Sequence, residues 1–349
     1  MSNLLAGAMI SPTIAAVLSV YGARTSGATA RELGEGGGFS QAQVWRVATP
    51  SGENFALRCT PADSLDRSRV EGLHRLLTWV HGRGVTQVPV PLAAGHGGTL
   101  VSRGEAWWQL EPWMPGEPGT NGSPVRLAAA MHCLARFHLA AATFDAAGPE
   151  VKWYFTGFAP SRGLAERLGH IARWNTAECL ALRGLAEKCD WKPLRPLARE
   201  ILDLYEHAAP AVAARLRLGS ETPVPLQPCL RDVWHDHVLF TGDVVTGLID
   251  AHACRSDTIA TDLARLLGSL VGDDRQAWET ALQAYQELRP LAINERGLIE
   301  LFDSSGTLLN GMTWLHSCLR LKHRFSHPQR ILDRLDQILK RLRHLADRV

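Results

Sequence analysis

A short β-hairpin pattern with acidic side chains near both ends constrains this chain most. Two apolar runs flank the turn Thr241-Gly242-Asp243, which predicts strand, turn, strand. Asp232 and His237 precede the hairpin and Asp250 follows it. Because the hairpin returns Asp250 toward the start of its first strand, two carboxylates and one imidazole can converge. This arrangement suits holding a metal-bound phosphate beside a base.

Taken alone, the hairpin has a simpler interpretation. An aspartate before a strand and another after a glycine-containing turn are ordinary turn residues, because their side chains bond to nearby backbone. The functional interpretation therefore requires nucleotide-binding parts elsewhere in the chain.

A glycine cluster upstream offers one such part. Gly36, Gly37 and Gly38 precede Phe39 and Ser40, and two alternating runs at 43–47 and 54–58 follow. These runs predict two strands joined by a turn at 49–52. Glycines let backbone N–H groups approach a polyphosphate closely, although a glycine cluster also fits a flexible turn.

The order of these parts resembles the aminoglycoside phosphotransferase, choline kinase and type II homoserine kinase group. The loop of that family usually reads His-Gly-Asp, four variable residues, then Asn. Here it reads Leu230-Arg231-Asp232, four residues, then His237. The resemblance implies an α+β, protein-kinase-like fold of two lobes. A small antiparallel sheet lobe is expected over residues 1–115, and a larger, mainly helical lobe over 116–349.

The resemblance also implies roles in phosphoryl transfer from ATP to a hydroxyl group of a small molecule. Asp232 would be the base or orienter of that hydroxyl. Asp250, with His237, would bind Mg²⁺, with Mn²⁺ as the alternative metal.

Further residues of the N-terminal lobe correspond to nucleotide-binding positions of the family. The loop 36–40 and Arg58 would contact the phosphates, and Glu71, on a helix expected from Asp66 to Trp79, would pair with Arg58. The segment 107–118, which includes Glu111 and Trp113, would be the hinge that receives the adenine. An edge strand broken by prolines fits the same segment.

His237 departs from the family pattern, because magnesium prefers oxygen ligands to imidazole nitrogen. Four explanations stay open: His237 bonds to Asp232 or phosphate, another metal is used, Asp236 substitutes, or catalysis is lost. The last makes a nucleotide-binding pseudokinase the rival hypothesis. A third hypothesis is a zinc site, for which the candidate ligands are His235, Asp236, His237, His252 and Cys254.

Composition bears on the partners and the location of the protein. The chain has 349 residues and a formal net charge of +2, which gives no electrostatic case for a nucleic acid partner. Seven scattered cysteines indicate reduced thiols and a cytoplasmic location. The apolar stretch at 4–20 is too short and interrupted for stable membrane insertion, and a helix over 14–21 is the simpler prediction.

The C-terminal two-thirds reads as helical. We expect a helix over 125–142 in which His138 is a packed residue, and several helices over 164–216, broken near 191–193 and 209–210. In related kinases such an insertion builds the acceptor pocket. Asp262 is expected to cap a helix and to hold the catalytic loop. An amphipathic helix pair is expected over 320–348.

Overall fold

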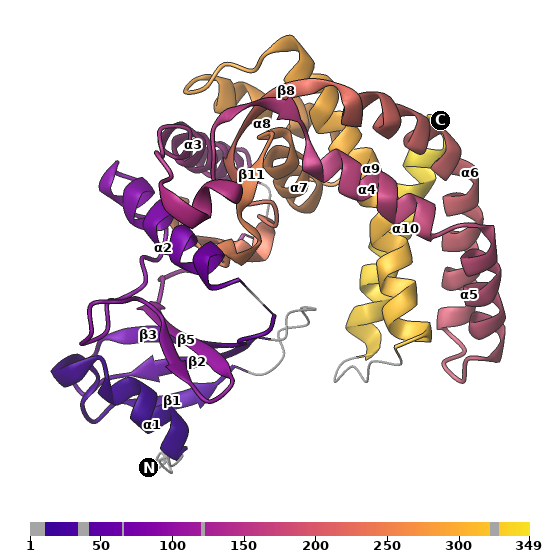
Figure 1. The fold of residues 1–349 in the computed structure, drawn as a ribbon. Helices are drawn as coiled ribbons and strands as arrows, with labels where there is room; N and C mark the ends of the chain where they lie inside the picture. The colour runs from indigo at the N-terminus through magenta and orange to yellow at the C-terminus, as the bar shows by residue number, and fades with distance from the viewer. Residues whose placement is uncertain (1–10, 34–41, 65, 120–122, 322–327) are drawn as a thin grey trace.

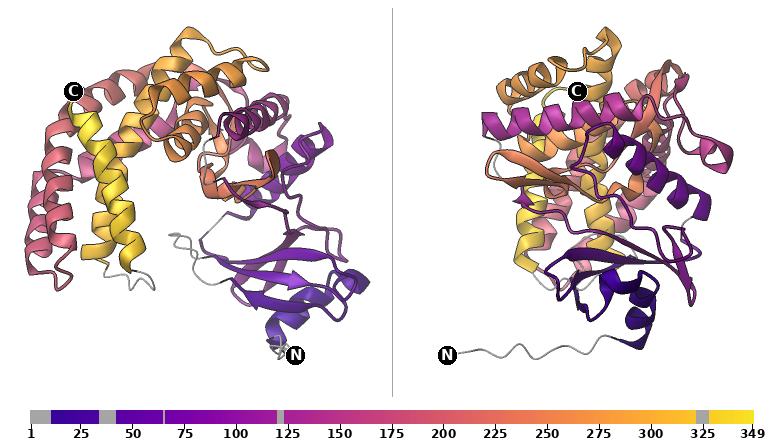
Figure 2. Two further views of the ribbon diagram at one scale, coloured as in Figure 1. Left: turned by 180° about the vertical axis from the view of Figure 1, so that it is seen from behind. Right: turned by 90° about the vertical axis from the view of Figure 1, so that its left-hand side faces the viewer.

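The protein forms two lobes and a helical arm (Figure 1). The computed structural model describes residues 11–33, 42–64, 66–119, 123–321 and 328–349. The sheet lobe and the arm, which includes α5, α6 and α10, extend from the same side of a central helical part, and the arch is equally plain from behind (Figure 2). The α+β, two-lobe architecture predicted from the sequence is confirmed.

The N-terminal lobe is one antiparallel sheet of five strands in the order β1-β2-β3-β5-β4. Its strands are β1 (Thr29–Glu32), β2 (Gln43–Ala48), β3 (Asn54–Pro61), β4 (Val101–Arg103) and β5 (Ala106–Pro112). The two strands and the turn predicted over 43–58 are therefore confirmed.

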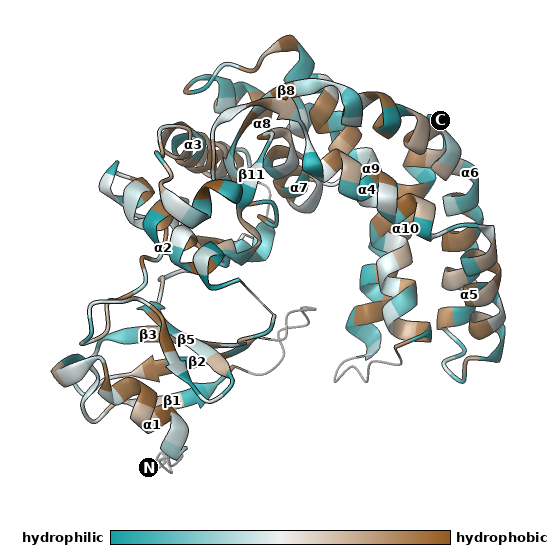
Figure 3. Ribbon diagram, viewed as in Figure 1, coloured by the Kyte–Doolittle hydropathy of each residue, from teal (hydrophilic) through white to brown (hydrophobic). Residues whose placement is uncertain are grey.

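One face of this sheet is covered by helix α1 (Pro12–Ser19), which begins with a Ser11 cap and a proline in its first turn. Its apolar side packs on the sheet in a cluster that includes Val17, Trp45 and Leu57. Figure 3 shows α1 largely in apolar colours. The predicted N-terminal helix is thus present, two residues earlier than expected.

The opposite face of the sheet carries the polar residues of the site. Strand side chains alternate between faces, so the residues that flank buried Leu57 point away from α1. In the register, Arg58 lies beside Gln109, and Ala56 lies beside Glu111. Arg58, Gln109 and Glu111 therefore share one surface, and this surface faces the lower lobe.

Helix α2 (Arg67–Gly82) connects the two lobes. Its N-cap is Asp66, and the helix predicted over 66–79 is confirmed. Its buried residues Leu73, Leu76 and Val80 belong to the large apolar cluster of the lower lobe and not to the sheet lobe's own cluster. The sequence placed α2 in the N-terminal lobe, but its packing ties it to the C-terminal one.

The central part of the lower lobe combines three helices with two small antiparallel sheets. The helices are α3 (Pro124–Ala141), α7 (Ala260–Leu270) and α8 (Arg275–Gln286). The sheet strands are β6 (Glu117–Pro118), β9 (Val238–Thr241) and β10 (Val244–Leu248) in one sheet, and β7 (Gly157–Pro160), β8 (Pro223–Cys229) and β11 (Arg255–Asp257) in the other.

The hairpin predicted from the sequence is the β9–β10 pair. Gly242 supplies the positive φ of 61° that its turn needs. Leu248 pairs with Val238, and the Ile249 N–H donates to the His237 carbonyl at 2.9 Å. Asp250 therefore returns to the loop that carries Asp232, as predicted.

The arm contains five helices among the described residues. They are α4 (Arg162–Arg173), α5 (Thr176–Lys188), α6 (Leu194–Glu221), α9 (Ile293–Leu319) and α10 (Pro328–Ala346). No described helix is both long and apolar enough to cross a bilayer.

Two helix boundaries differ from the sequence prediction. The predicted break at 209–210 is wrong, because α6 continues through Pro210. The buried residues Ala208 and Val212 on either side of Pro210 explain why: tertiary packing offsets the lost helical hydrogen bond. The helix pair predicted over 320–348 is a single described helix, α10, since α9 ends at Leu319.

Candidate active site between the two lobes

The loop before the hairpin is anchored by Asp262 on helix α7. The Asp262 carboxylate is fully buried and accepts hydrogen bonds from the backbone N–H groups of Leu230, at 2.7 Å, and Arg231, at 2.6 Å. His138, also buried, contacts it at 3.0 Å. The predicted role in holding the loop is confirmed, as is the packed position of His138. The predicted helix cap is wrong, because Asp262 lies within α7 and its carboxylate bonds to the loop and to His138.

This anchor fixes an uncommon backbone shape. Arg231 has a φ of 65°, in the left-handed region that non-glycine residues rarely adopt. Its guanidinium is held by Glu166 and lies 3.4 Å from Asp257. Asp232 follows this bend directly, so the backbone conformation of Arg231 sets the direction of its side chain.

Asp232 is about half exposed, with 48% of its side chain accessible. Its Oδ1 atom accepts two hydrogen bonds from Arg265, one from Nε at 3.2 Å and one from Nη2 at 3.0 Å. No described residue donates a hydrogen bond to Oδ2. This oxygen is therefore available to a ligand.

His237 lies between the two aspartates. Its Nδ1 donates to the Asp232 carbonyl at 2.7 Å, and its Nε2 accepts from the Trp234 indole N–H at 2.9 Å. The same Nε2 is 3.8 Å from Asp250 Oδ2. These partners fit a neutral imidazole protonated at Nδ1. To bind a metal, Nε2 would have to give up the indole hydrogen bond.

Asp250 meets the upper lobe. Its Oδ1 accepts from Arg58 Nη2 at 3.0 Å and lies 3.3 Å from His252 Nδ1. Burial alone would raise the pKa of Asp250, but the nearby His252 imidazole and the positive charge of Arg58 reverse that effect and lower it. Asp250 also has a positive φ of 58°. An ionised carboxylate is thus held between the lobes.

The predicted Arg58–Glu71 pair is wrong. Glu71 pairs with Arg67, one helical turn earlier, at 2.9 Å on an exposed face of α2. Arg58 instead reaches Asp250, and its buried Nε has no hydrogen-bond partner within the described ranges. A buried guanidinium donor without a partner is able to bind an anion such as phosphate.

Buried polar residues on the sheet face form the upper side of the candidate site. Gln109 donates to Glu111 at 3.0 Å, and His252 and His74 each lie 3.2 Å from the Gln109 amide oxygen. Trp113, further along the connection between lobes, stacks under Arg46 at 4.8 Å. The sequence singled out Glu111 and Trp113 but missed Gln109.

The acid–base state of Glu111 gives a pH-dependent prediction. Burial raises the pKa of Glu111 to about 7, despite the nearby charge of Arg58. A raised folded-state pKa favours folding in acid, and that contribution is lost as the pH rises through about 7. Between about pH 5 and pH 8, the native chain should lose up to about 3 kcal/mol of stability relative to Glu111→Gln. Denaturant unfolding at several pH values measures this, and parallel curves for the two proteins would contradict it.

The zinc hypothesis is not supported. His235, Asp236, His237, His252 and Cys254 are all described, yet they do not converge as one metal-binding group. Across the described ranges, the only group with that geometry is His138, Cys229 and Asp262, all buried. His138 and Asp262 there already bond to each other and to neighbouring groups.

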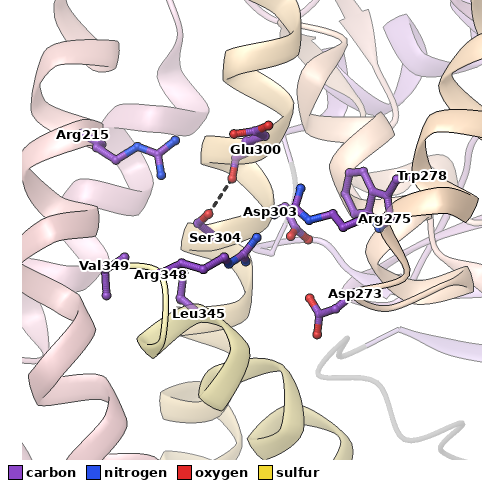
Figure 4. Close-up of a pocket in the computed structure, with 10 residues that line it drawn as sticks. All are labelled: Arg215, Asp273, Arg275, Trp278, Glu300, Asp303, Ser304, Leu345, Arg348 and Val349. Carbon is purple, nitrogen blue, oxygen red and sulfur yellow. Dashed lines mark hydrogen bonds between the residues drawn. The ribbon is translucent and has the colours of Figure 1, made fainter.

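A cavity of about 210 Å³ lies elsewhere, between α6, α8, α9 and the end of α10 (Figure 4). Two of its three acidic residues, Asp273 and Asp303, are paired with Arg341. None of the predicted site residues lines it. The predicted glycine loop, Gly36 to Ser40, lies outside the described residues.

The two-lobe fold is kinase-like, and the comparisons with known proteins agree. The model of the phosphotransferase enzyme family matches residues 32–297. The chain belongs to that family.

The sequence identity to individual relatives is low. A homoserine kinase of Gluconobacter oxydans is 25% identical over 307 residues, covering 83% of this chain and 86% of that one. An amicoumacin kinase solved with AMP-PNP and Ca²⁺ has a similar fold, with a TM-score of 0.66, 12% identity and coverage of 96% and 92%. A microcompartment-associated aminopropanol kinase also has a similar fold, with a TM-score of 0.61, 18% identity and coverage of 96% of both chains.

Proposed function

We propose that this protein is an ATP-dependent kinase that phosphorylates a hydroxyl group of a small molecule. One observation carries the proposal. Arg58 from the upper sheet and Asp250 from the lower hairpin meet at 3.0 Å, and His237 contacts both Asp250 and the backbone of Asp232. The groups to which we assign phosphate binding and metal binding thus meet between the lobes, and His237 links them to the loop that carries Asp232.

The residues present fit a magnesium nucleotide. Asp250 supplies the ionised oxygen ligand that Mg²⁺ prefers, and Mn²⁺ is bound by the same kind of ligand. The bound ion would neutralise charge on the phosphates. Arg58, with its unpartnered Nε, would bind a phosphate oxygen. We assign further nucleotide contacts to the loop containing Gly36, Gly37, Gly38, Phe39 and Ser40 and to the connection that contains Glu111 and Trp113.

Asp232 acts on the acceptor in this mechanism. Its Oδ2 orients the hydroxyl group and takes its proton as the acceptor oxygen bonds to the γ-phosphorus. The bond from that phosphorus to the bridging oxygen breaks, and ADP leaves. Alignment and charge neutralisation supply most of the catalysis in such a transfer.

We further propose residues 1–115 as the nucleotide-binding lobe, although α2 packs on the other lobe, and 116–349 as the catalytic and acceptor-binding lobe. All seven cysteines are free, which supports a reducing, cytoplasmic location.

His237 is proposed to shape the loop, because both of its ring nitrogens already have partners. His237→Ala should lower kcat by about 10- to 100-fold through loss of this support. His237→Asn keeps a donor for the Asp232 carbonyl and should retain most of the activity. Steady-state kinetics at varied MgATP measure both variants. An alanine variant as active as the native protein would contradict this role.

The relatives suggest the first acceptors for the test of function. L-homoserine and aminopropanol are incubated with γ-labelled ATP and magnesium, followed by a wider panel of amino alcohols and sugars. ATP-dependent labelling of an acceptor supports the proposal. Binding of ATP without consumption, whatever the acceptor, would instead support the rival pseudokinase.

A further inference from the structure

Arg265 lies on helix α7, three residues after Asp262. Residues three apart share one face of a helix, and these two act on the same loop. Asp262 holds the loop's backbone at Leu230 and Arg231, whereas Arg265 holds the side chain of Asp232. One helix face therefore controls both the path of the loop and the orientation of its carboxylate.

The contacts of Arg265 form part of a closed ring. Its guanidinium binds Asp232 Oδ1 and also lies over the Trp234 ring, 5.8 Å from the ring centroid. Trp234 donates to His237, and His237 donates back to the Asp232 carbonyl. Backbone and side chain of Asp232 are thus held from two directions.

The pairing is also selective for one oxygen. Both guanidinium donors go to Oδ1, and Oδ2 has no donor within the part of the chain that the structure describes. A carboxylate without this fork could rotate and present either oxygen. Fixing the carboxylate in one orientation lowers the entropy cost of bringing Oδ2 to the acceptor hydroxyl.

We propose that Arg265 is a positioning residue for phosphoryl transfer: it holds Oδ1 of Asp232 so that Oδ2 meets the acceptor hydroxyl. The inference rests on the proposed function of Asp232. It assigns Arg265 no contact with the nucleotide or the acceptor.

A merely structural ion pair would behave differently. The Arg265 and Asp232 side chains are 34% and 48% exposed, and ion pairs that exposed add little to stability. Loss of Arg265 should therefore appear in kcat and hardly at all in thermal stability or in KM for MgATP.

The test compares Arg265→Ala and Arg265→Lys with a matched control, Arg343→Ala. Arg343 makes a similar fork with Glu200, at 2.6 and 2.9 Å, on the exposed side of α10. ATP consumption is followed with homoserine, with aminopropanol and with water as acceptor. Asp232→Ala is measured in parallel. Arg265→Ala and Asp232→Ala are also assayed with added millimolar guanidinium.

We expect Arg265→Ala to lower kcat by about 10- to 100-fold, with an unchanged KM for MgATP and an unchanged Tm. Guanidinium should restore part of the activity in Arg265→Ala and none in Asp232→Ala. The kcat of Arg265→Lys should lie between those of the native protein and Arg265→Ala, because lysine keeps the positive charge but not the two parallel N–H donors. Arg343→Ala should match the native protein.

Other results would overturn the inference. An Arg265→Ala variant with native kcat, beside an inactive Asp232→Ala, would remove the role of Arg265 and leave the proposed function standing. A joint fall in kcat and Tm without guanidinium rescue would make Arg265 structural. Native turnover in Asp232→Ala, or no ATP consumption by the native chain, would overturn the proposed function and this inference with it.

Discussion

Removing the Asp232 carboxylate is expected to lower kcat by about 10²- to 10⁴-fold while the fold remains intact. The expected loss is large because Asp232 is the residue to which we assign the proton of the acceptor hydroxyl. The fold should survive because Asp232 is half exposed and its side chain is bonded only to Arg265 among the described residues. Asp232→Ala and the isosteric Asp232→Asn are compared by ATP turnover.

Both variants should still bind MgATP with nearly native affinity, since Asp232 contacts the acceptor and not the nucleotide in this mechanism. Calorimetric titration with AMP-PNP and magnesium provides the control. Phosphorylation of any acceptor at the native rate by either variant would contradict the assignment of Asp232.

Replacing Asp250 is expected to remove both metal binding and turnover. Asp250→Ala deletes the carboxylate that we propose as the metal ligand and leaves Arg58 without its partner across the lobes. We expect magnesium-dependent nucleotide binding to weaken by at least about 10- to 100-fold and kcat to fall by about 10³-fold or more. Titration of Mn²⁺, followed by electron paramagnetic resonance in the presence of ADP, measures the metal directly.

Asp243→Ala is the matched control for Asp250. Asp243 lies in the turn of the same hairpin, is 64% exposed, and pairs with Arg126 on the surface. Its removal should leave Mn²⁺ binding unchanged. Equal Mn²⁺ affinity in native protein and Asp250→Ala would show that the ion binds elsewhere.

The hairpin and the strands of the sheet could be predicted from sequence because their signals are local. The turn at Gly242 and the alternation around Arg58 each depend on a few neighbouring residues. The supporting role of Asp262 was predictable for another reason: its bonds to Leu230 and Arg231 join residues far apart in sequence, but the segment that carries it resembles a known family.

Long-range partners could not be predicted in this way. The sequence paired Arg58 with Glu71, whereas the folded chain pairs it with Asp250, 192 residues away. The sequence predicts a helix break at Pro210, yet packing of its neighbours lets α6 continue through it. Such outcomes depend on which surfaces meet after folding. The position of Arg265, three residues after Asp262, is the one signal in the sequence for its proposed role.

The most direct test of the central claim is to measure nucleotide binding and nucleotide consumption separately on the same protein. We predict that the native chain binds ATP only with a divalent ion and transfers its γ-phosphate to a small-molecule hydroxyl. Asp250→Ala should lose the metal-dependent binding, and Asp232→Ala should lose only the transfer. Metal-independent binding of ATP by the native chain, with no transfer to any acceptor, would contradict the account.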